Sequence, residues 1–165
     1  LSDAGALAYR KQPVDVVNLL EVVAGSFGER YRSRDLTLTL ALPTKAESFG
    51  DPDRLMQLFT NLLENSLRYT DAGGEVRVSL QQNGEYWQLR FADSAPGVDA
   101  EHQAHLFERF FRAESSRNRA SGGSGLGLAI CKNIVEAHSG SISAEHSDLG
   151  GLQIALNLPY VPHQK

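Results

Sequence analysis

The sequence predicts one two-layer α/β (α+β) domain, in which a mixed, mostly antiparallel sheet is covered on one face by helices. Some segments have apolar residues at intervals of three and four, as amphipathic helices do, and others alternate in the manner of half-buried strands. Four of the strand segments form two hairpins, an order that favours antiparallel pairing. With 165 residues and 41% hydrophobic content, the chain has enough material for one compact core.

The N-terminal part is expected to hold the end of one helix, a second helix and a strand. Residues 1–10 keep helical spacing with nothing upstream, so we interpret them as the end of a helix of a neighbouring domain. Apolar residues recur at intervals of three and four residues from Leu19 to Tyr31, which predicts a helix ending near Ser33. Leucines alternate with smaller residues over 36–42, which predicts a half-buried strand that Pro43 ends.

The helix after residue 50 has the clearest signals. Asp51 is a favourable N-cap, and Pro52 suits the first helical position because its missing N–H would have no partner there. Apolar residues over 55–63 then supply one face, and the turn at 71–74 ends the helix.

The other strands are expected as hairpins before and after a long loop. Asn83 and Gly84 form a strong turn signal in the first hairpin, and glycines 150 and 151 separate the strands of the second. Residues 112–125 are polar, rich in glycine and without a period, and a loop of this length argues for function. The expected strands are 75–82, 86–93, 141–146 and 152–158, with a short helix over 100–107 and a last helix over 126–138.

Composition excludes several classes of function. The net charge is -4, and the basic residues are scattered apart from a group at 109–119, so a nucleic-acid surface is not expected. The single cysteine, Cys131, excludes an internal disulfide and fits a reducing compartment. There is no apolar run of about 18 residues and no signal-peptide pattern, so we expect no direct membrane contact by this chain.

A polar stripe borders the apolar face of the helix that begins after Asp51. Asn61, Asn65 and Arg68 fall within roughly 60° of one another around this helix. Asparagine is a poor helix former, so two of them one turn apart call for an explanation. An amide oxygen suits Mg²⁺ whose charge is met mainly by nucleotide phosphates, and Arg68 could add a phosphate contact. Hydrogen bonds to neighbouring loops would explain the helix alone equally well.

A second candidate feature is the turn from Asp93 to Gly97, where a strand ends. A carboxylate there can accept hydrogen bonds from an amino group such as that of adenine, and Gly97 allows ligand and backbone to come close. Taken in isolation, the segment is more typical of a simple connecting turn.

The third feature is a glycine-rich run that leads into the last helix. Helix N-termini bind phosphate through free N–H groups and the helix dipole, so the run is a plausible triphosphate cradle, with a flexible linker as the alternative. It lacks the Lys-Ser or Lys-Thr of a P-loop, and Leu128 replaces the third glycine of a Rossmann fingerprint. The run consists of Gly122, Gly123, Ser124, Gly125, Leu126, Gly127 and Leu128.

Aromatic and basic residues interleave in the segment 106–112, LFERFFR, beside the glycine-rich loop. Its phenylalanines are more typical of core or loop anchors than of ligand contacts. Arg109 and Arg112 could neutralise phosphate charge, although a solvated pair is nearly as well supported.

In this order, NLLENSLRY at 61–69, the Asp93 turn, LFERFFR and GGSGLGLAI at 122–130 resemble the N, G1, F and G2 boxes of sensor histidine kinase ATP-binding domains. The resemblance covers nearly all of residues 11–160 and is far more specific than any single box. The segments FADSAPGV and LFERFFRAESSRNRASGGSGLGLAI are similar to those of bacterial envelope-stress sensors in this family.

The resemblance implies a GHKL or Bergerat-fold sandwich that binds ATP and Mg²⁺ in residues 11–160, with a lid at 112–125 and a tail at 161–165. Residues 1–10 would end the dimerisation and phosphoacceptor hairpin. By the family pattern, Asn65 would hold the metal with Asn61 near it, Arg68 would replace a phosphate-contacting lysine, and Tyr69 would lie against adenine. Asp93 would accept the adenine amino group, and the pocket and lid would be shaped by Gly97, Gly123, Ser124, Gly125, Leu126, Gly127 and Leu128.

One position departs from the family pattern: Ala95 stands where the Asp-x-Gly-x-Gly box has glycine, and we expect at most a modest loss of affinity from it. Gyrase-like relatives place a glutamate base where this chain has Asn61, and an amide cannot take a proton from water. Transfer to a histidine needs mainly positioning and charge neutralisation, which Asn61, Arg109 and Arg112 can supply.

No histidine of the chain stands in a phosphoacceptor box, so the acceptor is expected on a separate domain of the same protein. The resemblance also implies a response regulator as partner, a cytoplasmic location and a parent protein in the bacterial inner membrane. The chain alone is expected to be a monomer. Two alternatives remain at this stage: an ATP-hydrolysing module of the same fold, and a non-catalytic nucleotide-binding module.

Overall fold

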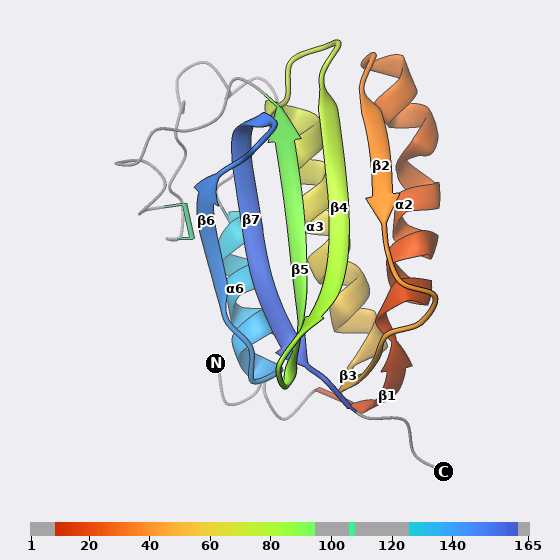
Figure 1. Cartoon of the computed structure of the whole chain (residues 1–165), viewed down its shortest axis with the longest axis vertical. Helices are drawn as coiled ribbons and strands as arrows, with labels where there is room; N and C mark the ends of the chain where they lie inside the picture. The colour runs from red at the N-terminus through yellow and green to blue at the C-terminus, as the bar shows by residue number, and fades with distance from the viewer. Residues whose placement is uncertain (1–8, 95–105, 108–125, 162–165) are drawn as a thin grey trace.

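A five-stranded mixed sheet forms one layer of the protein (Figure 1). The computed structural model describes residues 9–94, 106–107 and 126–161. Within these ranges the strand order is β2-β4-β5-β7-β6, where only the β2–β4 pair is parallel. The strands are β2 (Thr37–Ala41), β4 (Glu75–Asn83), β5 (Tyr86–Ser94), β6 (Ile142–His146) and β7 (Gly150–Pro159).

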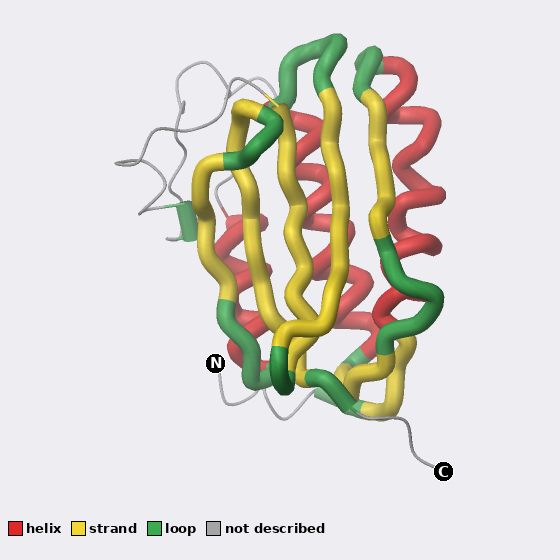
Figure 2. The backbone as a smooth tube through the Cα atoms, viewed as in Figure 1, coloured by secondary structure: helices red, strands yellow, loops and turns green. Residues whose placement is uncertain are grey.

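In the part of the chain that the structure describes, three helices form the second layer, and all of them lie on the same face of the sheet (Figures 1 and 2). They are α2 (Val16–Ser33), α3 (Pro52–Tyr69) and α6 (Leu126–Ala137). A small antiparallel ribbon of β1 (Gln12–Asp15) and β3 (Glu47–Gly50) lies beside the start of α2 and α3. The two-layer, mostly antiparallel fold class is therefore confirmed.

The central helix α3 forms where the sequence signals placed it. The carboxylate of Asp51 accepts hydrogen bonds from the backbone N–H of Asp53 at 3.0 Å and of Arg54 at 3.2 Å, which caps the helix. Its apolar face is buried against the sheet, and the rings of Phe59 and Phe91 on β5 stack with centroids 6.3 Å apart.

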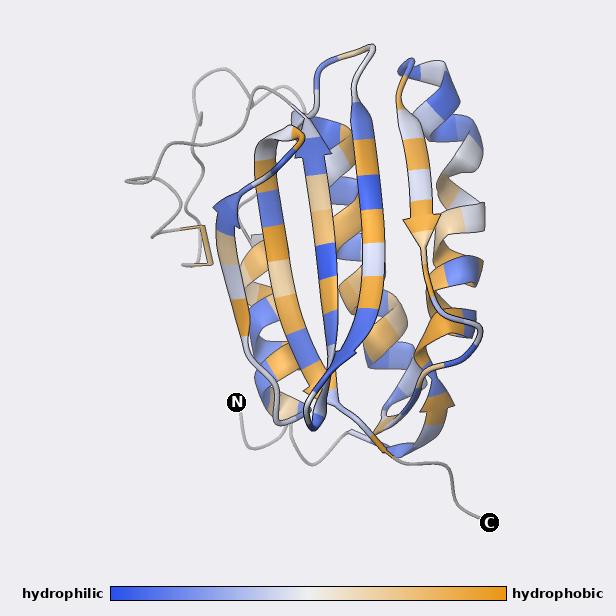
Figure 3. Ribbon diagram, in the orientation of Figure 1, coloured by the Kyte–Doolittle hydropathy of each residue, from blue (hydrophilic) through white to orange (hydrophobic). Residues whose placement is uncertain are grey.

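The sheet strands alternate as expected, which separates a packed face from an open one. Along β4 and β5, hydrophobic and hydrophilic residues follow one another in Figure 3. In the register of this hairpin, Val78 lies opposite Phe91 and Leu80 opposite Leu89, and all four are buried under the helices. Because Asp93 follows Phe91 by two residues, the alternation places its side chain on the helix-facing side of the sheet.

Most predicted elements are confirmed, and the differences concern short or boundary segments. The strands β1 and β3 were not predicted; they have four residues each, and Gln12 pairs with Gly50 and Asp15 with Glu47. Gly150 and Gly151 were expected between two strands but begin β7 instead. Tyr9 and Arg10 carry neither helix nor strand, whereas residues 1–8, most of the expected helix 100–107 and the loop 112–125 lie outside the described residues.

None of the helices in the described ranges combines the length and the apolar character that a bilayer crossing requires.

His138 joins the end of α6 to the start of α3. Its ring is buried, Nε2 accepts the backbone N–H of Asp51 at 3.0 Å, and Nδ1 lies 2.8 Å from the carbonyl oxygen of Ile134, which assigns the proton to Nδ1. Burial lowers the pKa of His138 below its ordinary value. Protonation at Nε2 would leave two donors facing each other and break this contact.

We expect replacement of His138 by glutamine to remove one pH-dependent component of stability. A histidine whose pKa is lowered on folding stabilises the fold fully above its unfolded pKa of 6.5, and this contribution is lost as pH falls below that value. Urea unfolding at pH 8 and pH 5 measures it: the parent should lose part of its advantage over the variant at pH 5. An equal difference at the two pH values would show that His138 does not titrate with folding.

Candidate nucleotide-binding site

The predicted polar stripe lies on the last turns of α3. Its residues are half-buried and lie next to buried leucines of the same helix. They are Asn61, Asn65, Arg68 and Tyr69. The side chain of Asn65 has no hydrogen-bond partner among the described residues. A half-buried amide without a partner is available to a ligand, and its oxygen has the chemistry of a Mg²⁺ ligand.

Asn61 faces α6. Its side chain lies close enough to the thiol of Cys131 to influence the pKa of that thiol, which approaches the carbonyl oxygen of Leu58 at 3.8 Å. Burial raises the pKa of the Cys131 thiol to about 12, and the contact with Asn61 lowers it, so this cysteine stays protonated. Asn61 carries an amide, which cannot act as a base.

The contact between Cys131 and the middle of α3 also fixes the position of the start of α6. In Figure 1, α3 and α6 run side by side in opposite directions. The first residue of α6, Leu126, precedes Cys131 by five positions, about 7.5 Å at 1.5 Å per residue. The N-terminus of α6 therefore lies about level with Asn65, where its free N–H groups favour an anion.

Arg68 is engaged in a charged network on the side of α3 that faces α2. Its guanidinium lies 3.8 Å from the carboxylate of Glu64, which also accepts a hydrogen bond from Arg30 on α2 at 2.8 Å. These partly exposed pairs contribute about 0–1 kcal/mol each, so Arg68 can leave Glu64 for a stronger partner. Glu64 is directed toward α2 and away from Asn65, as its position around the helix predicts.

Asp93, at the end of β5, is the buried carboxylate of the site. Asp93 is only 5% exposed, and its Oδ1 accepts a hydrogen bond from the backbone N–H of Leu152 on β7 at 2.8 Å. Burial raises the pKa of Asp93 to about 7, and the hydrogen bond from Leu152 opposes this rise. Burial, and after it the Asp93 carboxylate, raises the pKa of Tyr31, whose hydroxyl donates to the carbonyl oxygen of Leu63 at 2.8 Å. Asp93 therefore lies beside the C-terminal half of α3.

The described parts of the three predicted motifs meet at one end of the helical layer. The last turns of α3 and the end of β5 lie at the same end of the molecule, and α6 begins beside the C-terminal half of α3, although these segments come from sequence positions far apart (Figure 1). The separation between Asn65, Asp93 and Leu126 along the chain exceeds 25 residues in each step. A ligand with a base and a phosphate chain fits this combination of an acidic acceptor, an amide oxygen and a helix N-terminus.

Other predicted site residues lie outside the described residues. These are Gly97, Arg109, Arg112, Gly123, Ser124 and Gly125. At the described end of the glycine-rich run, Gly127 is half-buried, and Leu128 packs into the core. Any phosphate contact of Leu128 would therefore use its backbone.

Gly151 is a residue of the site that the sequence analysis did not identify. A side-chain carbon at this position would collide with Oδ1 of Asp93 and with the carbonyl oxygen of Ser94. The sequence signal was a Gly-Gly pair, which we interpreted as a turn, and nothing local indicated that it packs against a residue 58 positions away.

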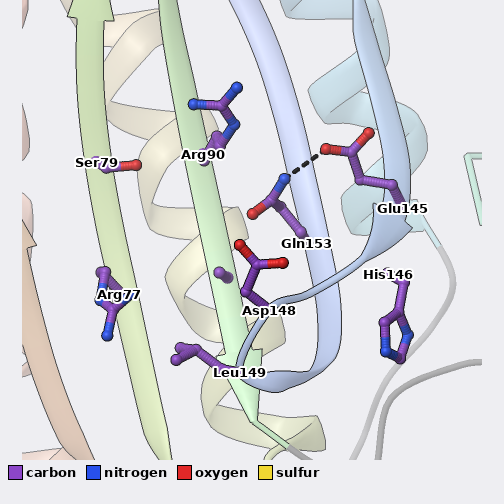
Figure 4. Close-up of a pocket in the computed structure, with 9 residues that line it drawn as sticks. Arg77, Ser79, Arg90, Glu145, His146, Asp148, Leu149 and Gln153 are labelled. Atoms are coloured by element: carbon purple, nitrogen blue, oxygen red, sulfur yellow. Dashed lines mark hydrogen bonds between the residues drawn. The ribbon is translucent and has the colours of Figure 1, made fainter.

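A polar depression of about 500 Å³ lies on the opposite, open face of the sheet (Figure 4). Arg77 and Arg90 line it together with the acidic Glu145 and Asp148, so its charges are mixed. Ala92 forms part of it, whereas Asp93 is directed to the other face. None of the predicted site residues that the structure describes lines this depression, and we do not assign the nucleotide to it.

These features define the class of protein. Residues 50–162 match the family model described as histidine kinase-, DNA gyrase B-, and HSP90-like ATPase, and the chain belongs to this family. Within it, the sequence and fold are those of the ATP-binding catalytic domain of a sensor histidine kinase.

The chain is similar to the signal transduction histidine-protein kinase BaeS of Escherichia coli (strain K12), with 62% identity over 96% of this chain and 34% of that protein. The solved structure of the mycobacterial sensor histidine kinase MprB has 29% identity and a TM-score of 0.78, covering 93% of this chain and 100% of that one. The structure of full-length ShkA in complex with AMPPNP has 26% identity and a TM-score of 0.79, covering 94% of this chain and 32% of that one. The chain spans about a third of the length of BaeS.

Proposed function

We propose that this domain binds Mg-ATP at the end of the helical layer and donates the γ-phosphoryl group to a histidine on a separate domain of the same protein. The observation that carries the proposal is that the Asn65 amide, which has no partner among the described residues, the buried Asp93 carboxylate and the N-terminus of α6 all lie beside the C-terminal half of α3. The complex of the similar kinase ShkA with AMPPNP supports a nucleotide ligand.

Four described residues have roles in this proposal. Asp93 accepts the adenine amino group, and Tyr69 lies against the base. Asn65 supplies an oxygen ligand to Mg²⁺, which would neutralise phosphate charge when bound. Arg68 exchanges Glu64 for a phosphate oxygen, because a guanidinium binds phosphate more strongly than a partly exposed carboxylate.

Arg109, Arg112 and the run from Gly123 to Leu128 complete the site in this proposal by neutralising and cradling the triphosphate, with Gly97 beside the base. In the transfer step, the bond from the γ-phosphorus to the bridging oxygen of ADP breaks and a phosphorus–nitrogen bond to imidazole forms. The unprotonated imidazole nitrogen supplies the electron pair of the new bond, the leaving oxygen of ADP takes the pair of the broken bond, and the other ring nitrogen then loses its proton.

Hydrolysis by the domain alone is disfavoured by the same contacts. A water nucleophile needs a base near the phosphates, but Asn61 is an amide, and Glu64 pairs with Arg30 on the side of α2. Transfer to a positioned imidazole has no such need, because neutral imidazole is itself a nucleophile at pH 7.

Restoring the acceptor domain tests the proposal. The longer protein with its phosphoacceptor domain, given Mg-ATP labelled at the γ-phosphorus, should form an acid-labile, base-stable phosphohistidine, and the chain in isolation should not. Chelation of Mg²⁺ by EDTA serves as the control and should abolish labelling. Failure of the longer protein to form phosphohistidine while it binds ATP would contradict the proposal.

We further propose a response regulator as the next phosphoryl acceptor and a parent protein anchored in the bacterial inner membrane, with this domain in the cytoplasm and monomeric on its own. The similarity to BaeS extends the proposal to envelope stress.

A further inference from the structure

The position of the Asp93 carboxylate depends on a strand that is distant in the sequence. Asp93 lies in an irregularity of the β5–β7 pairing: Ala92 is opposite Gln153, whereas Ser94 is opposite Gly150. The shift turns the start of β7 toward the carboxylate. As a result, the backbone N–H of Leu152 donates to Oδ1 at 2.8 Å, the one hydrogen bond to this carboxylate among the described residues.

This approach requires that residue 151 has no side chain. A Cβ at Gly151 would overlap both Oδ1 of Asp93 and the carbonyl oxygen of Ser94. One of these atoms is backbone, so the strain cannot be relieved by a side-chain rotation alone. Either β7 moves away from β5 at this point or the carboxylate turns out of its position.

We propose that Gly151 is a positioning residue for adenine recognition, because its bare backbone lets the Leu152 N–H hold the Asp93 carboxylate with its second oxygen free for an amino group. The inference rests on the proposed function and adds a specificity determinant to it. Oδ1 is occupied by Leu152, so Oδ2 is the acceptor that remains for the amino group of adenine.

The protonation state of Asp93 gives the proposal a measurable signature. Because Oδ1 accepts from Leu152, a proton on Asp93 would reside on Oδ2. Two hydrogen-bond donors, this O–H and the adenine amino group, would then face each other. Burial has raised the pKa of Asp93 to about 7, so ATP affinity should fall as pH drops below about 7. Loss of the Leu152 hydrogen bond, which opposes that rise, should move the midpoint upward.

Few other groups can produce the same signature. Tyr31 of α2 is the titratable neighbour coupled to Asp93 among the described residues, and its raised pKa keeps it neutral throughout this range. Val76 of β4 faces Asp93 in the sheet register, and Leu152 of β7 contacts it. No ionisable group of α3 in the described residues influences its titration.

The test compares Gly151→Ala with the parent domain in binding ATP and inosine triphosphate, which lacks the amino group. For the variant we expect ATP affinity about 10- to 100-fold lower and inosine triphosphate affinity nearly unchanged, the loss of one hydrogen bond to a charged group. The midpoint of ATP affinity against pH should also move upward. An equal loss for both nucleotides, or no loss, would overturn the proposal.

Gly140→Ala is the matched control. A Cβ at Gly140 would collide with the carbonyl oxygen of Asn157, also on β7 but near its other end. It should lower the melting temperature as Gly151→Ala does, yet keep the parent's preference for ATP. A loss of that preference in the control would attribute the effect to general disruption of β7.

Two further measurements keep the proposal testable if Gly151→Ala folds poorly. In the parent, the NMR signal of the Leu152 amide should titrate with the same midpoint as ATP affinity, and this titration should be absent from Asp93→Asn; a silent amide would overturn the proposal. In the Asp93→Asn background, Gly151→Ala should cost little further ATP affinity. A parent domain that binds neither nucleotide would contradict the proposed function itself and this inference with it.

Discussion

Asn65→Ala is expected to abolish most metal-dependent ATP binding while leaving the fold intact. The amide has no partner among the described residues, so its removal leaves no buried polar group unpaired, and alanine is the better helix former. Loss of a protein ligand to Mg²⁺ should lower ATP affinity about 10- to 100-fold, the range found when groups that support a metal site are removed. Calorimetry with ATP in Mg²⁺ and in EDTA measures it.

The metal dependence distinguishes this effect from a general one. In EDTA the parent and the variant should bind ATP about equally, because the amide acts through the ion. Thr60→Ala offers a control on the exposed side of the same helix, and it should change neither affinity. If Asn65→Ala bound Mg-ATP like the parent, the assignment of the metal ligand to Asn65 would be wrong.

Features decided by neighbouring residues could be predicted from the sequence. The side chain of Asp51 accepts from N–H groups two and three residues later, and Pro52 adds a local constraint. The start of α3 can therefore be predicted from a few neighbouring residues. The same helix period brings Asn61 and Asn65 to one stripe. The hairpin of β4 and β5 turns at Gly84, whose φ of 65° suits glycine.

Features decided by distant pairing could not be predicted in the same way. The β1–β3 ribbon joins two strands of four residues, too short to show a period, and its pairing spans a helix and a strand. Arg68 could be placed on α3, but its ion pair with Glu64 and the contact of Glu64 with Arg30 depend on how α2 packs.

Asp93 shows most clearly the difference between features decided by neighbouring residues and features decided by distant ones. A strand ending in an acid predicted the candidate Asp93, because a carboxylate after an apolar strand is visible in the sequence. Its burial, its raised pKa and its hydrogen bond to Leu152 depend on a contact across 59 positions. The role of Gly151 follows only from that contact, since a Gly-Gly pair alone is typical of a turn.

Asp93→Asn is expected to raise the stability of the ligand-free domain and lower its affinity for ATP. The amide keeps an acceptor for the Leu152 N–H but carries no charge into the buried site. The carboxyl group has an unfolded pKa of 3.8 and a folded pKa of about 7, so its protonated form is favoured by folding. Its contribution to stability is therefore fully present below 3.8, falls as pH rises toward 7, and stays lost above that value.

The stability gain should consequently be large at pH 8 and small near pH 4. The difference between the two pKa values sets an upper limit of about 4 kcal/mol, at 1.36 kcal/mol for each pH unit. Urea unfolding of both proteins at the two pH values measures it, and an equal gain at both would show that the carboxyl group does not titrate as its burial requires. The titration of His138 cancels in this comparison because both proteins contain it.

The affinity should change in the opposite direction, because the asparagine amide offers one acceptor oxygen, which Leu152 already occupies, and presents its NH₂ to the amino group of adenine. At pH 8 we expect ATP to bind at least tenfold more weakly, with inosine triphosphate little affected. A variant that gained stability and kept its preference for ATP would show that the buried charge is not needed for adenine recognition. If both effects occur together, the buried carboxylate destabilises the empty domain because the ionised group is required to bind adenine.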